Sequence, residues 1–88
     1  METANISTIT KFDICYRILN NKEKKYLVLN KFTGRISWTK FIKQASLIDI
    51  WSKLFLSEHK LRLLKKYKDK LVLISMPNPN YYNYDNKR

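Results

Sequence analysis

The sequence predicts a small α+β domain, in which three N-terminal strands and one short C-terminal strand form an antiparallel sheet covered by one or two helices. Apolar residues alternate with polar ones in the first half of the chain, as in half-buried strands. Between residues 46 and 68 they recur instead at helical spacing. With 88 residues, the chain has room for one domain and one small core. We expect residues 1–8 to be a flexible lead-in, residues 9–76 the domain, and residues 77–88 an extended or disordered tail rich in Tyr and Asn.

Residues 9–19 form the first expected strand, because their side chains alternate with a period of two. One face would be buried and carries the apolar side chains of Phe12, Ile14, Tyr16 and Ile18. The opposite face would be exposed and carries Lys11, Asp13, Cys15 and Arg17. Residues 20–25 contain no apolar side chain and predict a turn.

The second and third strands are expected at residues 26–32 and 35–41, where two further apolar runs occur. A short polar break with the only glycine of the chain, Gly34, separates them. Glycine adopts positive φ at little cost, so this break predicts a tight hairpin with Gly34 in the left-handed region, closing a bulge.

A helix is expected to follow, because residues 47–55 wound at 100° per residue place their apolar side chains in one arc of about 160°. We predict that it begins near Ser46, since the run from Ser46 to Asp49 resembles a capping box. A helix that begins at Thr39 is the alternative, which leaves residues 39–45 open between strand and helix.

A second helix is expected over residues 58–68, with Ser57 as its N-cap. It would be separate from the first helix or continue it after a bend, and it would bury Leu61, Leu64 and Tyr67. The apolar run at residues 71–74 predicts the fourth strand. Trp38 and Trp51 both fall on apolar faces, which predicts that they anchor the core.

Several classes of function find no support in the composition. Cys15 is the only cysteine, so neither a disulfide within the chain nor a cysteine-based zinc site can form. The single histidine, His59, lies in a basic stretch, and one glycine cannot build a phosphate-binding loop. We therefore expect no enzyme activity, cofactor or metal. No transmembrane segment or signal peptide is recognisable, so a cytoplasmic location is expected.

Positive charge is the strongest functional signal in this sequence. The net charge is +11, and residues 22–70 hold fourteen basic residues against four acidic ones. Such an excess attracts polyanions. Lysine far outnumbers arginine, and Asn, Ile and Tyr are also abundant. All four have A/T-rich codons, so genome composition is a second explanation for part of the excess.

Two basic groups and one aromatic group are the candidate binding residues. The first basic group surrounds the predicted turns and consists of Lys22, Lys24, Lys25, Lys31 and Arg35. The second lies on the predicted second helix and consists of Arg62, Lys65 and Lys66. The aromatic group lies in the tail, where stacking or docking is possible for Tyr81, Tyr82 and Tyr84.

These residues favour a nucleic-acid-associated protein that binds DNA or RNA mainly through phosphates. The alternative is a protein-interaction module, either an assembly subunit or an inhibitor, that docks on an acidic surface of a larger complex. Binding to anionic lipid is less favoured, because no predicted helix pairs a wide exposed apolar face with its lysines. The choice between DNA and RNA and the oligomeric state are left open.

Overall fold

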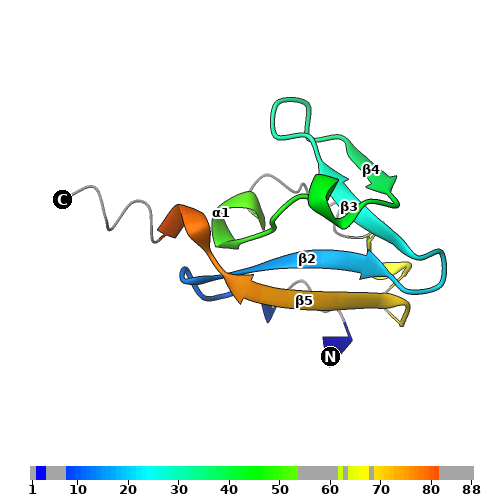
Figure 1. Ribbon diagram of the computed structural model, residues 1–88, viewed down its shortest axis with the longest axis horizontal. Helices are drawn as coiled ribbons and strands as arrows, with labels where there is room; N and C mark the ends of the chain where they lie inside the picture. The colour runs from blue at the N-terminus through cyan, green and yellow to red at the C-terminus, as the bar shows by residue number, and fades with distance from the viewer. Residues whose placement is uncertain (1, 4–7, 54–61, 63, 68, 82–88) are drawn as a thin grey trace.

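An antiparallel sheet of five strands, in the order β1-β5-β2-β3-β4, organises this protein (Figure 1). The structure is a computed structural model that describes residues 2–3, 8–53, 62, 64–67 and 69–81. The strands are β1 (Glu2–Thr3), β2 (Ile14–Asn20), β3 (Lys25–Leu29), β4 (Ile36–Thr39) and β5 (Leu71–Pro77). After β4, residues 40–53 contain two short helices, η2 (Ile42–Gln44) and α1 (Ile50–Lys53). The predicted α+β class and the antiparallel sheet of three N-terminal strands and one C-terminal strand are confirmed.

The centre of the sheet is the pairing of β2 with β5, which runs in register from Ile14 opposite Pro77 to Asn20 opposite Leu71. β2 begins later than the predicted residue 9, and β5 continues beyond the predicted residue 74. The segment expected to be a lead-in contributes a strand of its own, because β1 pairs with β5 at the edge of the sheet.

The hairpin between β3 and β4 forms as predicted. Gly34 has a φ of 71° and so occupies the left-handed region. Its backbone N–H donates to the Asn30 carbonyl at 2.7 Å, while the Asn30 side-chain oxygen accepts from the N–H of Phe32 and of Thr33 at 2.9 and 3.2 Å. The loop thus uses residues 30–35, which makes both strands shorter than the apolar runs in the sequence indicated.

β2 and β3 share only two pairs of their register and then diverge. The segment that follows η2 fills the gap between them. The Ser46 N–H donates to the Leu27 carbonyl at 3.0 Å, and Ile48 and Tyr16 exchange two backbone hydrogen bonds at 2.7 and 2.8 Å. The Ser46 hydroxyl contacts the backbone of Leu29, to whose N–H it lies 2.7 Å away. Ser46 therefore ties this segment to β3 and does not cap a helix, contrary to the prediction.

The α-helix α1 begins at Ile50 and is capped by Asp49, whose Oδ1 accepts from the Ser52 N–H at 2.7 Å. This start lies beyond both predicted ones. The interior residue of α1 is Ser52, which is 3% exposed, whereas Trp51 is 54% exposed. The prediction of Trp51 as a core anchor is therefore wrong. The Trp51 ring packs instead on Phe12, 46% exposed, with ring centroids 5.1 Å apart.

The core lies between the sheet and the segment that precedes β5. Its fully buried side chains include Ile9, Ile18, Leu27, Ile48 and Leu71. Trp38 packs against this core, as predicted, and makes an edge-to-face contact with Tyr67 at 6.0 Å. Residues 62, 64 and 65 are helical and Leu64 is buried, in agreement with the predicted second helix. Residues 66 and 67 form a turn, and residues 58–61, 63 and 68 of the predicted helix lie outside the described residues.

Cys15 is fully buried, so its predicted place on an exposed strand face is wrong. β2 is an inner strand of the sheet. The Cys15 thiol lies near the end of β5 and donates a weak hydrogen bond to the Pro77 carbonyl, with 3.7 Å between sulfur and oxygen. Burial raises the pKa of the Cys15 thiol above its ordinary value of 9.0, the Asp49 charge adds to this rise, and the Arg17 charge opposes it.

We expect the Cys15 thiol to react with a disulfide reagent about 100-fold or more slowly in the folded protein than in urea, because the thiol becomes accessible only when the structure opens locally.

The raised pKa of Cys15 also makes the folded state prefer the neutral thiol. This contribution to stability is complete below the unfolded pKa and is lost as pH rises through the folded pKa. Stability relative to a Cys15→Ala variant should therefore fall above pH 9, the ordinary value. A pH-independent difference between the two proteins would contradict this.

Candidate polyanion-binding surface

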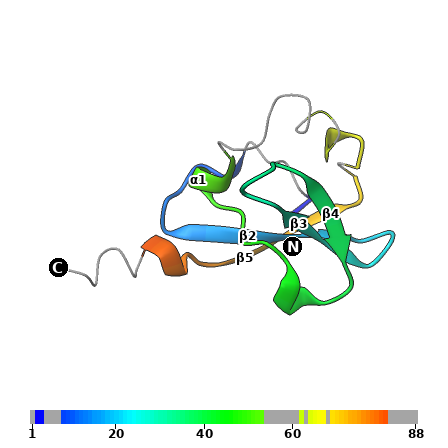
Figure 2. The same ribbon diagram turned by 90° about the horizontal axis from the view of Figure 1, so that it is seen from above.

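One end of the sheet gathers lysines from three separate segments. Asn20, the last residue of β2, lies opposite both Lys25 and Leu71, so β3 and β5 begin at this end. The pairing of Tyr26 with Thr39 places the end of β4 there too. In Figures 1 and 2 these strand ends lie together at the right-hand side. We call this surface the basic end and define it by its lysines, Lys22, Lys24, Lys25, Lys40, Lys43 and Lys70.

The turn between β2 and β3 is held by the buried side chain of Asn20. Its oxygen accepts from the N–H of Lys22 and of Glu23 at 3.2 and 3.3 Å, and its amide donates to the Glu23 carboxylate at 3.3 Å. Next to it, the Asn21 N–H donates to the Lys70 carbonyl at 2.6 Å. These bonds fix the backbone of the turn beside the start of β5, so Lys70 lies opposite Asn21, the residue that precedes Lys22.

The η2 loop is fixed in a similar way at the end of β4. The Thr39 hydroxyl accepts from the Phe41 N–H at 3.2 Å and donates to the Gln44 side-chain oxygen at 3.1 Å. The Gln44 N–H in turn donates to the Phe41 carbonyl at 3.0 Å. Lys40 and Lys43 are both exposed on this loop. The loop therefore presents two cations on a backbone that is itself hydrogen-bonded.

The basic end carries more positive than negative charge. All of its lysines are exposed apart from Lys25, which is half-buried at the start of β3. Two acidic residues, Glu23 and Asp69, lie in the same segments. The Glu23 carboxylate is engaged by Asn20, and Lys24 donates to the Asn21 side-chain oxygen at 2.7 Å. The excess of cations makes this end attractive to polyanions.

The first predicted basic group does not form one cluster. Lys22, Lys24 and Lys25 belong to the basic end, whereas Lys31 and Arg35 flank the exposed loop at the other end of β3. Five strand residues separate the two ends by roughly 17 Å. Residues close in the sequence therefore lie apart in space, because a hairpin strand carries its two turns at opposite ends.

Sequence reasoning missed Lys40 and Lys43, and it placed Lys70 in neither basic group. A signal for the two missed residues exists in the sequence. No acidic residue occurs between Glu23 and Asp49, and that stretch contains six basic ones. The stretch forms the β3–β4 hairpin and η2, so its lysines cannot be neutralised by acids from their own segment.

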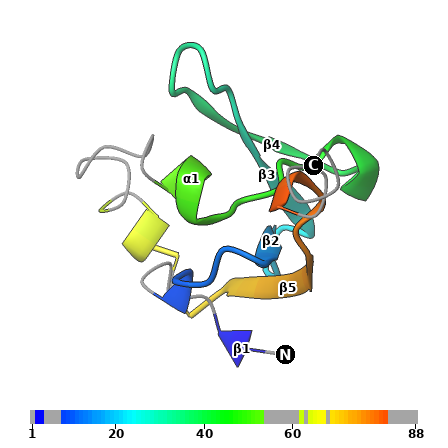
Figure 3. The same cartoon turned by 90° about the vertical axis from the view of Figure 1, so that its left-hand side faces the viewer.

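The second predicted group, Arg62, Lys65 and Lys66, is exposed on the segment before β5. Figures 2 and 3 show the coloured parts of this segment (yellow) and η2 (green) on opposite sides of the sheet. This group and the η2 lysines therefore do not form one continuous surface.

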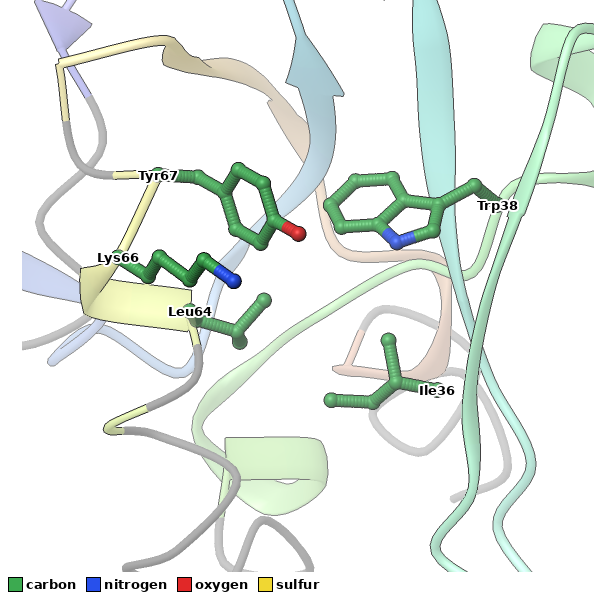
Figure 4. Close-up of a pocket in the computed structure, with 5 residues that line it drawn as sticks. All are labelled: Ile36, Trp38, Leu64, Lys66 and Tyr67. Atoms are coloured by element: carbon green, nitrogen blue, oxygen red, sulfur yellow. The ribbon is translucent and has the colours of Figure 1, made fainter.

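A small cavity of about 200 Å³ lies between this segment and β4, lined by Ile36, Trp38, Leu64, Lys66 and Tyr67 (Figure 4). The Tyr67 hydroxyl points toward the Trp38 ring across it. The Lys66 amine lies 5.8 Å from the centroid of the Tyr67 ring. Binding pockets for small molecules usually measure about 300–1,000 Å³. We therefore interpret the cavity as the seam where the segment packs on β4.

Arg17 and Tyr81 lie away from the basic end. Arg17 is half-buried, and its guanidinium donates to the Met76 sulfur at 3.5 Å. Tyr81 is 43% exposed on a helical turn after β5, whereas Tyr82 and Tyr84 lie outside the described residues.

Among the described residues, no three His, Cys, Asp or Glu side chains are placed to hold a metal ion. None of the described helices is long and apolar enough to cross a membrane.

Comparisons with known proteins identify no relative of this chain. A scan against models of protein families, a search of curated proteins and a search of solved structures each gave no match.

Proposed function

We propose that this protein is a small, basic, non-enzymatic protein that binds DNA or RNA mainly through phosphate contacts at the basic end. The observation that carries this proposal is the convergence of lysines from three segments on one end of the sheet, with turns whose backbones are fixed by Asn20 and Thr39. Lysines that served only to keep the surface solvated would be expected to lie scattered over it, not gathered at one end.

The chemistry of these side chains favours the phosphate backbone over base edges. All cations of the basic end are lysines, and a lysine ammonium is a compact point charge without the planar fork with which arginine reads guanine. Lysine contacts to phosphate give affinity and position but little sequence information. We therefore propose binding with weak sequence preference.

A salt titration of binding to fluorescent duplex DNA, single-stranded DNA and RNA tests this function. Six phosphate contacts on duplex DNA would give a slope of log affinity against log salt of roughly −5, and about −4 on a single strand. We expect a slope of this size and a preference for one of the three forms. Weak binding that is equal on all three forms and is lost near physiological salt would contradict the proposal, because any polycation behaves in this way.

Matched charge reversals locate the contacts. Lys22→Glu with Lys70→Glu changes two exposed residues of the basic end, and Lys65→Glu with Lys66→Glu changes two exposed residues of the segment before β5. We expect the first pair to lower affinity about tenfold or more and to reduce the salt slope by about 2, since each phosphate contact contributes about one unit. The second pair should have the smaller effect.

A second candidate function, a protein-interaction module that docks as an assembly subunit or inhibitor, is favoured by a different surface. The rings of Phe12 and Trp51 pack against each other at a tilted angle and remain about half exposed. Aromatic side chains of this kind are enriched where proteins bind one another. Co-purification of a stoichiometric protein that survives nuclease treatment would favour this function over the first.

A further inference from the structure

An aromatic ring lies exposed within the basic end. Phe41 is 66% exposed on the η2 loop, between the exposed residues Lys40 and Lys43. Ile42 beside it is 40% exposed, so the apolar surface is continuous there. Neither residue belongs to the buried core. These side chains therefore contribute little to the stability of the fold, and stability does not explain why they lie there.

The backbone that carries Phe41 is fixed on both sides. Before it, the Phe41 N–H is bound by the Thr39 hydroxyl, and Thr39 itself lies in register with Tyr26. After it, Ala45 is buried and the Ser46 N–H is bound to the Leu27 carbonyl. A ring on a fixed backbone loses less conformational freedom on binding than a ring on a mobile loop.

We propose that the ligand of the basic end is a single-stranded nucleic acid and that Phe41 stacks on one of its bases, while Lys40 and Lys43 contact phosphates on either side. This proposal rests on the proposed function and names its substrate class. Stacking on an aromatic ring needs an exposed base face, which single strands offer and a stacked duplex covers. Stacking also accepts any base, which agrees with the weak sequence preference expected of lysine contacts to phosphate.

The charges around Phe41 favour a nucleic acid over a protein as its partner. Lysine is depleted at the centres of protein interfaces, whereas grooves that bind single strands combine positive charge with stacking rings. Phe41 has lysines on both sides and faces no acidic residue of its own segment. The Phe12–Trp51 pair, by contrast, lies at the other end of β2, away from the basic end.

The chain offers a matched control for Phe41. Phe32, at the tip of the β3–β4 hairpin, is 100% exposed and is also flanked by two basic residues, Lys31 and Arg35. It lies at the opposite end of β3, away from the lysines of the basic end. Phe41→Ala and Phe32→Ala therefore remove the same ring from similar local sequence but from different surfaces.

The experiment measures fluorescence anisotropy with a labelled oligothymidine, an RNA of the same length and a DNA duplex. We expect Phe41→Ala to lower affinity for the single strands about 5- to 100-fold, as loss of one stacked base does, and to leave the salt slope unchanged. Phe41→Tyr keeps a ring and should bind within about twofold of the natural protein. Phe32→Ala should bind as the natural protein does, and circular dichroism should show that all variants fold.

Each of the other outcomes overturns a defined part of the proposal. If Phe41→Ala binds single strands as tightly as the natural protein, stacking by Phe41 is excluded and the proposed phosphate binding stands. Tighter binding of the natural protein to the duplex would overturn the single-strand preference. If only Phe32→Ala weakens binding, the stacking surface is the hairpin tip and not the basic end. No salt-dependent binding to any of the three nucleic acids would overturn both this inference and the proposed function.

Discussion

Replacement of Asn78 by alanine is expected to lower the free energy of unfolding by about 3 kcal/mol, because a buried carboxylate and two partly buried backbone groups lose their partners at once. Asn78 is 1% exposed. Its amide donates to the Phe12 carbonyl at 2.9 Å and to the Asp49 carboxylate at 3.0 Å, and its oxygen accepts from the Asn80 N–H at 3.0 Å.

The position of Asn78 explains why this effect should be so large. The side chain joins the loop before β2, the cap of α1 and the end of β5, which are far apart in the sequence. Asp49 is only 3% exposed, and one of its carboxylate oxygens already serves the Ser52 N–H. Without Asn78 the other oxygen loses its donor in a site from which water is largely excluded. Leaving a buried charged group without a partner costs more than the bond itself contributes.

Urea unfolding of Asn78→Ala and Asn80→Ala measures this effect. Asn80 is exposed two residues away, and its contact to Asn78 uses its backbone N–H, which alanine retains. Asn80→Ala should therefore remain within about 0.5 kcal/mol of the natural protein. A loss below about 1 kcal/mol for Asn78→Ala would show that water replaces the missing amide.

Local patterns in the sequence were sufficient to predict the hairpin and four strands of the sheet, but not β1. Gly34 between two apolar runs indicated the turn, and the structure confirms its positive φ. The α1 helix shows where such patterns fail. Ser46 looked like a cap, but its hydroxyl and N–H bind β3, and Asp49 caps the helix while it also holds Asn78. These bonds depend on where distant segments meet, and no local pattern encodes that.

Asn78 and the basic end show the same limit. Asn78 lies in a stretch whose prolines and polar composition predicted a tail, yet it is buried because it meets Phe12 and Asp49. The basic end likewise depends on strand register, which brings Lys70 beside the β2–β3 turn and the end of β4 beside the start of β3. When charges are grouped by their distance in the sequence, Lys31 falls in the same group as Lys25 and Lys40 does not. In the structure, Lys40 lies at the same end of the sheet as Lys25, and Lys31 lies at the other.

Removal of four charges from the basic end is expected to lower affinity for nucleic acid on the order of 100-fold near 0.1 M salt and to reduce the salt slope by about 3 to 4. The variant combines Lys24→Asn, Lys40→Gln, Lys43→Gln and Lys70→Gln. Asparagine is chosen for Lys24 because this residue has a φ of 56°, a left-handed conformation that asparagine adopts more readily than other residues with a side chain. The substitution thus removes the charge without disturbing the turn.

The control variant separates the position of the charges from their number. It combines Lys11→Gln, Lys31→Gln, Arg35→Gln and Lys53→Gln, which lie in the loop before β2, the hairpin loop and α1, away from the basic end. Both variants carry four fewer positive charges than the natural chain of net charge +11. A surface that binds phosphates directly loses its contacts only in the first variant, because charges beyond about 10 Å are largely screened at this salt concentration. Equal losses in the two variants would mean that net charge alone attracts the polyanion, and the basic end would then have no special role.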